Sequence, residues 1–108
     1  KFPLWLTPEQ VIILPISEKY QKYAEKVLNL LENSEIRALI DDRNEKTGRK
    51  IRDAELNKIP FMIIVGEQEE NDGTVSVRKQ GEGDIGTLSN NEFISFIKKE
   101  INSTLEQF

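Results

Sequence analysis

Two short apolar runs constrain the fold of this 108-residue chain more than any other feature. They are VIILPI, residues 11–16, and PFMIIVG, residues 60–66, and polar sequence bounds each of them. A strand has this composition when both faces of its sheet are covered, because neither side of the strand then meets water. The chain is therefore expected to form a sheet with helices on both faces.

The segment between the two runs predicts a parallel crossover. After Ser17, a candidate helix cap, apolar residues recur at helical spacing while the charged residues turn outward. IRALID, residues 36–41, then alternates as a second strand. A strand, a helix and a strand with short joints imply a right-handed parallel unit. The apolar stripe of the helix consists of Tyr20, Tyr23, Ala24, Val27, Leu28 and Leu31.

The second half of the chain predicts a weaker helix over about residues 48–58, the buried strand 60–66, a polar turn over 67–73 and an antiparallel strand over 73–79. A short last strand is expected over residues 85–88. Ser89 and Glu92 then form a capping box for a final helix. The inner stripe of that helix is Phe93, Phe96, Ile97, Ile101 and Leu105. These elements predict an α/β domain with a mixed sheet.

The composition excludes several kinds of site. With no cysteine and no histidine, the chain has no disulfide, no thiolate nucleophile, no Ser-His-Asp triad and no histidine-based zinc site. The adjacent acids Asp41–Asp42 and Glu69–Glu70 lack the spacing of a calcium loop and are expected to be solvated. Neither catalytic nor metal-binding residues are therefore expected. The formal net charge of -4 does not indicate a polyanion partner, and no apolar run approaches the roughly 20 residues that cross a bilayer.

The first ten residues differ from the rest. Pro3 and Pro8 flank Trp5, and the sequence begins without methionine. We interpret residues 1–10 as a linker from an upstream domain and residues 11–108 as the folded unit.

GEGDIG, residues 81–86, has the letters of the dinucleotide fingerprint G-x-G-x-x-G. That fingerprint needs a following helix and a second parallel strand, and only one helix remains before the chain ends. Glu82 and Asp84 would also repel a pyrophosphate. The segment is predicted to be a flexible turn.

The stretch DDRNEKTGRKIRDAE, residues 41–55, is the best candidate for a binding site. Its basic residues lie at the end of the second strand and the start of the next helix, where open α/β sheets bind ligands. A helix amino terminus also offers free N–H groups to an anion. The alternative is a solvated helix face with local pairs such as Arg49–Asp53. The basic residues are Arg43, Lys46, Arg49, Lys50 and Arg52.

Two residues outside this stretch favour RNA. Arg78 lies on the face of its strand opposite Val75 and Val77, and Glu69 lies in the segment that leads into the strand. Arginine and glutamate together supply donors and acceptors for an unpaired base edge, while the basic cluster suits phosphates.

Four segments carry a resemblance to a known family: WLTPEQVIILPIS, DDRNEKTGRKIRDAELNKIPFMIIVG, GTVSVR and DIGTLSNNEF. In this order they resemble the C-terminal anticodon-binding domain of threonyl-tRNA synthetases, which are class IIa aminoacyl-tRNA synthetases. RNEK with KIRDAEL, and GTVSVR with DIGTLS, are typical of the threonyl member. The resemblance implies a three-layer α/β/α domain whose five strands have the order 2-1-3-4-5, with strand four antiparallel.

The resemblance also implies a function. The domain would bind the anticodon loop of tRNA(Thr), and the full cytoplasmic enzyme, expected to be a homodimer, would attach threonine to this tRNA with ATP. ATP and zinc are expected only in an upstream catalytic core of the same polypeptide, so this domain alone is not catalytic. Neither a membrane nor DNA is an expected partner. The alternative is a protein-interaction module that keeps this fold.

Three positions match the groups with which the family reads the second and third anticodon bases, G and U. Glu69 would accept from N1–H and N2–H of guanine, Arg78 would donate to base oxygens or a phosphate, and Asn44 would bind the uracil edge. Lys46 and Arg52 match positions that approach the anticodon loop. Arg43 and Arg49 complete the predicted set, although Arg49 stands where the family often has an apolar or aromatic residue.

Overall fold

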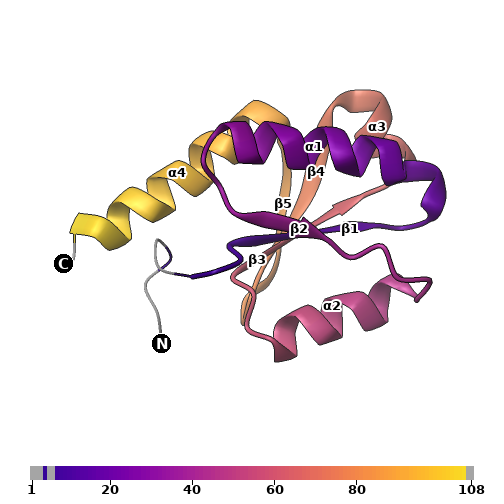
Figure 1. Cartoon of the computed structure of the whole chain (residues 1–108), viewed down its shortest axis with the longest axis horizontal. Helices are drawn as coiled ribbons and strands as arrows, with labels where there is room; N and C mark the ends of the chain where they lie inside the picture. The colour runs from indigo at the N-terminus through magenta and orange to yellow at the C-terminus, as the bar shows by residue number, and fades with distance from the viewer. Residues whose placement is uncertain (1–3, 5–6, 107–108) are drawn as a thin grey trace.

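The computed structural model describes residue 4 and residues 7–106, with side chains to residue 103. Figure 1 shows a sheet with helices on both sides. No helix of these described residues is long and apolar enough to cross a membrane. The elements are β1 (Val11–Pro15), the 3₁₀ turn η2 (Glu18–Tyr20), α1 (Gln21–Asn33), β2 (Ala38–Ile40), α2 (Thr47–Leu56), β3 (Phe61–Val65), α3 (Glu67–Asp72), β4 (Thr74–Lys79), β5 (Gly83–Ser89) and α4 (Asn90–Glu106).

The sheet has the strand order β2-β1-β3-β4-β5. β1 runs parallel to both β2 and β3, so Val11 lies opposite Ala38 on one side and Phe61 on the other. β4 runs antiparallel to β3 and β5. The predicted order and the antiparallel fourth strand are both confirmed.

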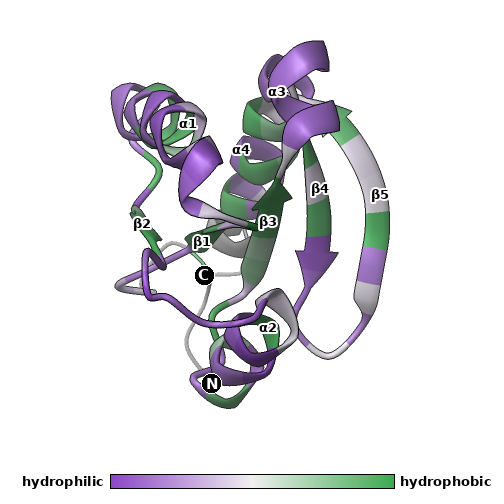
Figure 2. Ribbon diagram, turned by 90° about the vertical axis from the view of Figure 1, so that its right-hand side faces the viewer, coloured by the Kyte–Doolittle hydropathy of each residue, from purple (hydrophilic) through white to green (hydrophobic). Residues whose placement is uncertain are grey.

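The two faces of β1 pack into two different cores. Val11 and Ile13 join the core beneath α1 and α4, whereas Ile12 and Leu14 join a smaller core with Ala54 of α2. All five residues of β1 are buried for this reason. Figure 2 shows α2 on one side of the sheet and α1 and α4 on the other. The predicted three-layer arrangement is confirmed.

α2 does not extend over β4 and β5. Val75 and Val77 are buried in the larger core, while Thr74, Ser76 and Arg78 alternate with them and are partly exposed. Because the core beneath α2 contains no residue of β4 or β5, the polar face of these two strands is open to solvent beside α2. We call it the α2 face of the sheet.

The prediction of a polar turn over residues 67–73 was wrong, because residues 67–72 form α3. The segment has no apolar periodicity that could have revealed a helix. The Gly66 N–H donates to the Glu69 Oε1 at 2.8 Å at the start of α3. Gly73 ends it with a left-handed φ of 69°, a conformation that glycine adopts without strain.

The last strand is longer than predicted, because β5 begins at Gly83 and ends at Ser89. Residues 81–82 of the GEGDIG segment form the predicted turn, whereas residues 83–84 already belong to the strand, so the turn predicted for those two residues was wrong. The capping box is confirmed: the Ser89 N–H donates to the Glu92 Oε1 at 2.9 Å, and the Glu92 N–H donates to the Ser89 Oγ at 3.1 Å. The side chain of Leu105 lies outside the described residues.

The described part of the first ten residues lies against the domain. Leu4 packs into the larger core, and the buried Gln10 side chain donates to the Leu4 carbonyl at 3.0 Å. Arg37, which precedes β2, donates through Nη2 to the Thr7 carbonyl at 2.7 Å. Pro3 and Trp5 lie outside the described residues. That this segment is a linker from a catalytic core stays a prediction.

Candidate RNA-binding surface

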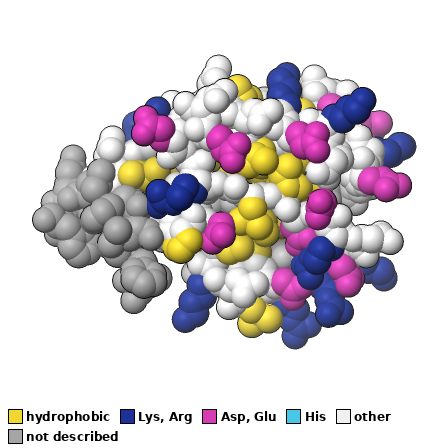
Figure 3. Space-filling view, viewed as in Figure 1, with side chains coloured by type: hydrophobic (Ala, Val, Ile, Leu, Met, Phe, Trp, Pro, Cys, Tyr) yellow, Lys and Arg dark blue, Asp and Glu magenta, His cyan; other side chains and the backbone are white. Residues whose placement is uncertain are grey.

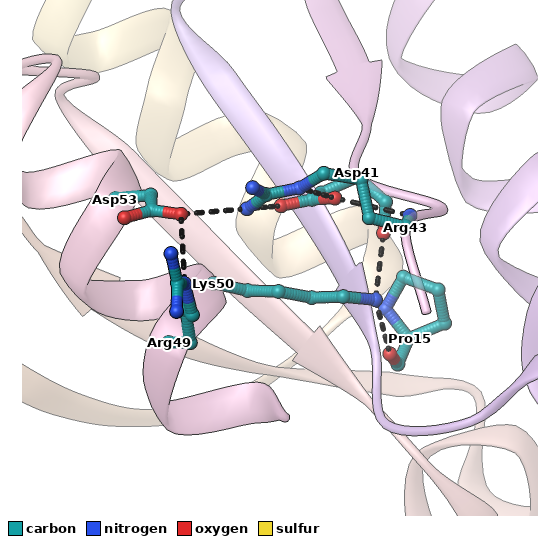
Figure 4. Close-up of polar contacts among 6 residues, drawn as sticks. All are labelled: Pro15, Asp41, Arg43, Arg49, Lys50 and Asp53. Atoms are coloured by element: carbon teal, nitrogen blue, oxygen red, sulfur yellow. Dashed lines mark hydrogen bonds and ion pairs between the residues drawn. The ribbon is translucent and has the colours of Figure 1, made fainter. Parts of the chain in front are cut away.

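Two carboxylates hold the loop between β2 and α2 through Arg43. Arg43 donates to Asp41 from Nε at 2.9 Å and from Nη2 at 2.8 Å, and Nη2 also lies 3.0 Å from the Asp53 Oδ2 (Figure 4). The hydrogen bond from Arg43 lowers the pKa of Asp41, although the burial of this carboxyl opposes the shift. The same contacts raise the pKa of Arg43. Arg43 therefore fastens the loop to α2.

Lys50 is the second residue that holds α2 against the sheet, and its assignment to the basic surface cluster was wrong. Its side chain is only 4% exposed. The ammonium donates to the Asp41 carbonyl at 2.9 Å and lies 3.5 Å from the Pro15 carbonyl (Figure 4). Lys50 therefore ties the first turn of α2 to the carboxyl ends of β1 and β2.

The other predicted residues of this stretch lie at the surface. Asn44, Lys46, Arg49 and Arg52 are all exposed. The predicted pair of Arg49 with Asp53 is present at 4.0 Å, the outer limit of an ion pair. Figure 3 shows basic and acidic side chains interspersed around α2 and the loop that leads into it. The region thus presents cations to a ligand without forming a uniformly basic patch.

The Glu69 carboxylate of α3 reaches β4, the strand that carries Arg78, through a residue that the sequence did not single out, Ser76. Glu69 accepts from the Gly66 N–H through Oε1 and from the Ser76 hydroxyl through Oε2, at 3.0 Å. Ser76 and Arg78 are two residues apart on one strand, so both lie on the α2 face. The only signal for Ser76 is this alternation with Val75 and Val77.

The guanidinium of Arg78 is incompletely satisfied. Its Nε is buried and has no hydrogen-bond partner within the described part of the chain. Across the sheet Arg78 faces Met62 of β3 and Asp84 of β5, and the Asp84 Oδ1 accepts from the Gly86 N–H instead. A buried donor without a partner costs stability.

Residues of both predicted groups lie near the carboxyl edge of β1 and β3. The strand order 2-1-3 places the topological switch point between these two strands, and open α/β sheets bind ligands at this place. The Lys50 contact with the Pro15 carbonyl brings α2 to one side of the edge. Glu69, which follows β3, lies on the other side. The structure thus places residues 44–52 and Glu69 on either side of this edge, whereas Arg78 pairs with Met62 near the amino end of β3 and its guanidinium lies toward Gly83.

The surface is open at this edge. A hollow of about 370 Å³ lies elsewhere, beside the start of β2, and none of the predicted RNA-binding residues lines it. Within the described residues, no group of three or more aspartates and glutamates could hold a metal ion. An open polar surface suits splayed, single-stranded bases better than a small enclosed ligand.

Comparison with known proteins identifies the family of the domain. Residues 10–100 match the family model described as an anticodon binding domain. The chain belongs to the anticodon-binding domain family. This membership confirms the predicted resemblance at the level of the domain.

Its relatives include threonine–tRNA ligases. The one from Flavobacterium johnsoniae is 62% identical over 109 residues, which cover 99% of this chain. The one from Bacteroides fragilis is 59% identical over 108 residues, which cover 100% of it. This chain spans only 17% of the length of each ligase.

A solved structure is similar as well. It is the crystal structure of the RNA-binding domain of threonyl-tRNA synthetase from Cryptosporidium parvum Iowa II, with a TM-score of 0.86 and 29% sequence identity. The match covers 93% of this chain and 25% of that chain.

Proposed function

We propose that this chain is the anticodon-recognition domain of a threonine–tRNA ligase and that it binds the anticodon loop of tRNA(Thr). The observation that carries the proposal is that the Glu69 carboxylate of α3 binds Ser76 on the open sheet face that also carries Arg78, beside the exposed residues of α2. The complete ligase would attach threonine to the tRNA with ATP. Its catalytic core, with the ATP and zinc sites, would lie outside this chain, and its second copy would complete a homodimer.

Glu69 is suited to read guanine. A carboxylate has about four acceptor positions, and the two intramolecular bonds of Glu69 occupy one on each oxygen. The remaining positions can accept from N1–H and N2–H of the second anticodon base. The bonds from Gly66 and Ser76 hold the carboxylate in place before RNA arrives, which reduces the entropy lost on binding.

Arg78 supplies donors to the same face. The terminal nitrogens of its partly exposed side chain can donate to base oxygens or to a neighbouring phosphate. On the other side of the edge, Asn44 has both a donor and an acceptor for the uracil edge. Exposed Lys46, Arg49 and Arg52 lie where phosphates would approach. Arg43 contributes indirectly, because its contacts with Asp41 and Asp53 fix the loop that carries Asn44.

One observation favours a second candidate. The formal net charge is -4, and acids are interspersed among the basic residues around α2. These features suit a protein-interaction module that retains the fold without binding RNA.

The experiment compares Arg78→Ala with Lys46→Ala in binding to a threonine anticodon stem-loop. We expect Arg78→Ala to cost about 1–3 kcal/mol and to relax the base preference. Lys46→Ala should weaken binding to all loops alike and reduce the slope of log affinity against log salt by about 0.7. The matched control is Lys22→Ala, because Lys22 is an exposed residue of α1, on the other side of the sheet from α2. It should change neither the base preference nor the salt slope.

Equal loss of base discrimination in the Arg78 and Lys46 variants would contradict this division of roles. Absence of binding to every loop at low salt would favour the protein-interaction module.

A further inference from the structure

We propose that Ile16 is an apolar platform on which the base accepted by Glu69 stacks. The inference rests on the proposed function and adds a specificity residue to it. The Ile16 side chain is 49% exposed, which is unusual for an isoleucine that directly follows a fully buried strand. Single exposed apolar residues are common on protein surfaces, so the argument depends on where this one lies.

Ile16 lies at the switch point. Its N–H donates to the Val65 carbonyl at 3.0 Å, so the chain beyond β1 still follows the end of β3. Ile12 and Leu14 face α2, and the two-residue period of an extended chain puts Ile16 on the same side. The neighbouring Pro15 carbonyl is the one that Lys50 of α2 contacts. Ile16 therefore lies between α2 and Glu69.

Gly66 brings the Ile16 side chain and the Glu69 carboxylate together. A Cβ at Gly66 would lie 2.7 Å from Ile16 Cδ1 and 3.3 Å from Glu69 Oε1. The two side chains therefore lie next to each other over the same glycine. Real Cβ atoms essentially never approach other atoms as closely as 2.7 Å, so Ile16 can take this position only because residue 66 has no side chain.

This pairing matches the chemistry of a guanine. The polar edge of the base would meet the carboxylate, and its flat face would cover the adjacent aliphatic side chain. Covering a half-exposed isoleucine removes apolar surface from water and is favourable. Proteins bind splayed RNA bases through hydrogen bonds at the base edge and stacking on the base face. Here an aliphatic side chain would supply the contact with the face.

The test is a double-mutant cycle in which substitutions of Ile16 are combined with a change in the RNA and the binding affinities are measured. One RNA is the stem-loop with a threonine anticodon, and the other has an abasic site at the second anticodon position. We expect Ile16→Ala to weaken binding to the intact stem-loop about fivefold, from the apolar contact area lost, and to leave binding to the abasic stem-loop unchanged. Ile16→Val should give a smaller loss of the same kind, and Ile16→Met should restore the affinity for the intact stem-loop.

Leu56→Ala is the control, because Leu56 is 72% exposed at the end of α2, away from the edge. It should change neither affinity, and thermal melting of all variants checks their folding. If the unsubstituted chain binds the intact stem-loop more tightly than the abasic one and the Ile16 variants keep this difference in full, the proposal that Ile16 is a stacking platform is wrong. Equal weakening toward both RNAs also overturns it. If the unsubstituted chain binds both RNAs equally, the proposed function fails, and the platform fails with it.

Discussion

Replacing Lys50 with methionine tests whether a buried cation holds α2 to the sheet. The side chains are similar in length, so the substitution removes the ammonium and leaves most of the packing. The Asp41 and Pro15 carbonyls, both in buried residues, lose their contact with the Lys50 Nζ. The 2.9 Å bond to Asp41 is well formed, whereas the 3.5 Å contact with Pro15 is weak.

The cost follows from these two contacts. A hydrogen bond to a charged group contributes about 1.5–3 kcal/mol, and methionine recovers part of this because no cation then has to be desolvated. We therefore expect Lys50→Met to reduce the free energy of unfolding by about 1–3 kcal/mol. For a domain of this size the melting temperature should fall by roughly 5–20 °C.

The assay is urea unfolding followed by circular dichroism, with Arg49→Met as the matched control. Arg49 is the preceding residue of α2, its side chain is 66% exposed, and its ion pair is long. Exposed pairs of this kind contribute little, so the control should change the free energy of unfolding by less than about 0.5 kcal/mol. Equal effects of the two substitutions, or a more stable Lys50→Met variant, would refute the role given to Lys50.

Two further substitutions test the neighbouring contacts. Asp41→Asn should lower the free energy of unfolding at neutral pH, because the hydrogen bond with Arg43 is the main cause of the lowered pKa of Asp41. This stabilisation is present above the unfolded pKa near 3.8, and it is lost as the pH falls through the lower folded pKa. The control is Asp42→Asn, at an exposed neighbouring carboxylate, and the assay is urea unfolding at a series of pH values. If Asp41→Asn still has a lower free energy of unfolding than the unsubstituted chain in strong acid, the ion pair is not the cause. Gly66→Ala should change the melting temperature by only a few degrees, because the added Cβ meets the flexible end of the Ile16 side chain. The displaced Ile16 should nevertheless weaken stem-loop binding as Ile16→Ala does. Unchanged binding would show that the position of Ile16 does not matter.

The strands and long helices could be predicted because the local pattern of apolar residues indicates which of their faces are buried. VIILP is apolar at every position, and all five residues are buried between two helical layers. α3 could not be predicted in this way, because six consecutive polar residues carry no periodicity. It depends on the Glu69 carboxylate, which binds the Gly66 N–H, and on Gly73 at its end.

The internal contacts of the candidate surface could not be predicted from the sequence. Lys50 has the same charge as its neighbour Arg49, and only the approach of the β1 and β2 carboxyl ends buries it. Ile16 belongs to an apolar run, and its exposure depends on how the chain leaves the sheet. Ser76 is an ordinary strand position until α3 brings Glu69 to it.

The most direct measurement compares the affinity of the unsubstituted chain for two stem-loops, one with a threonine anticodon and one with its second anticodon base changed from G to A. Glu69 should accept from N1–H and N2–H of guanine, and adenine lacks both donors. The account predicts that the change weakens binding by about tenfold or more, since each mismatched contact costs about 1–3 kcal/mol. Equal affinity for the two stem-loops would contradict anticodon recognition by this surface.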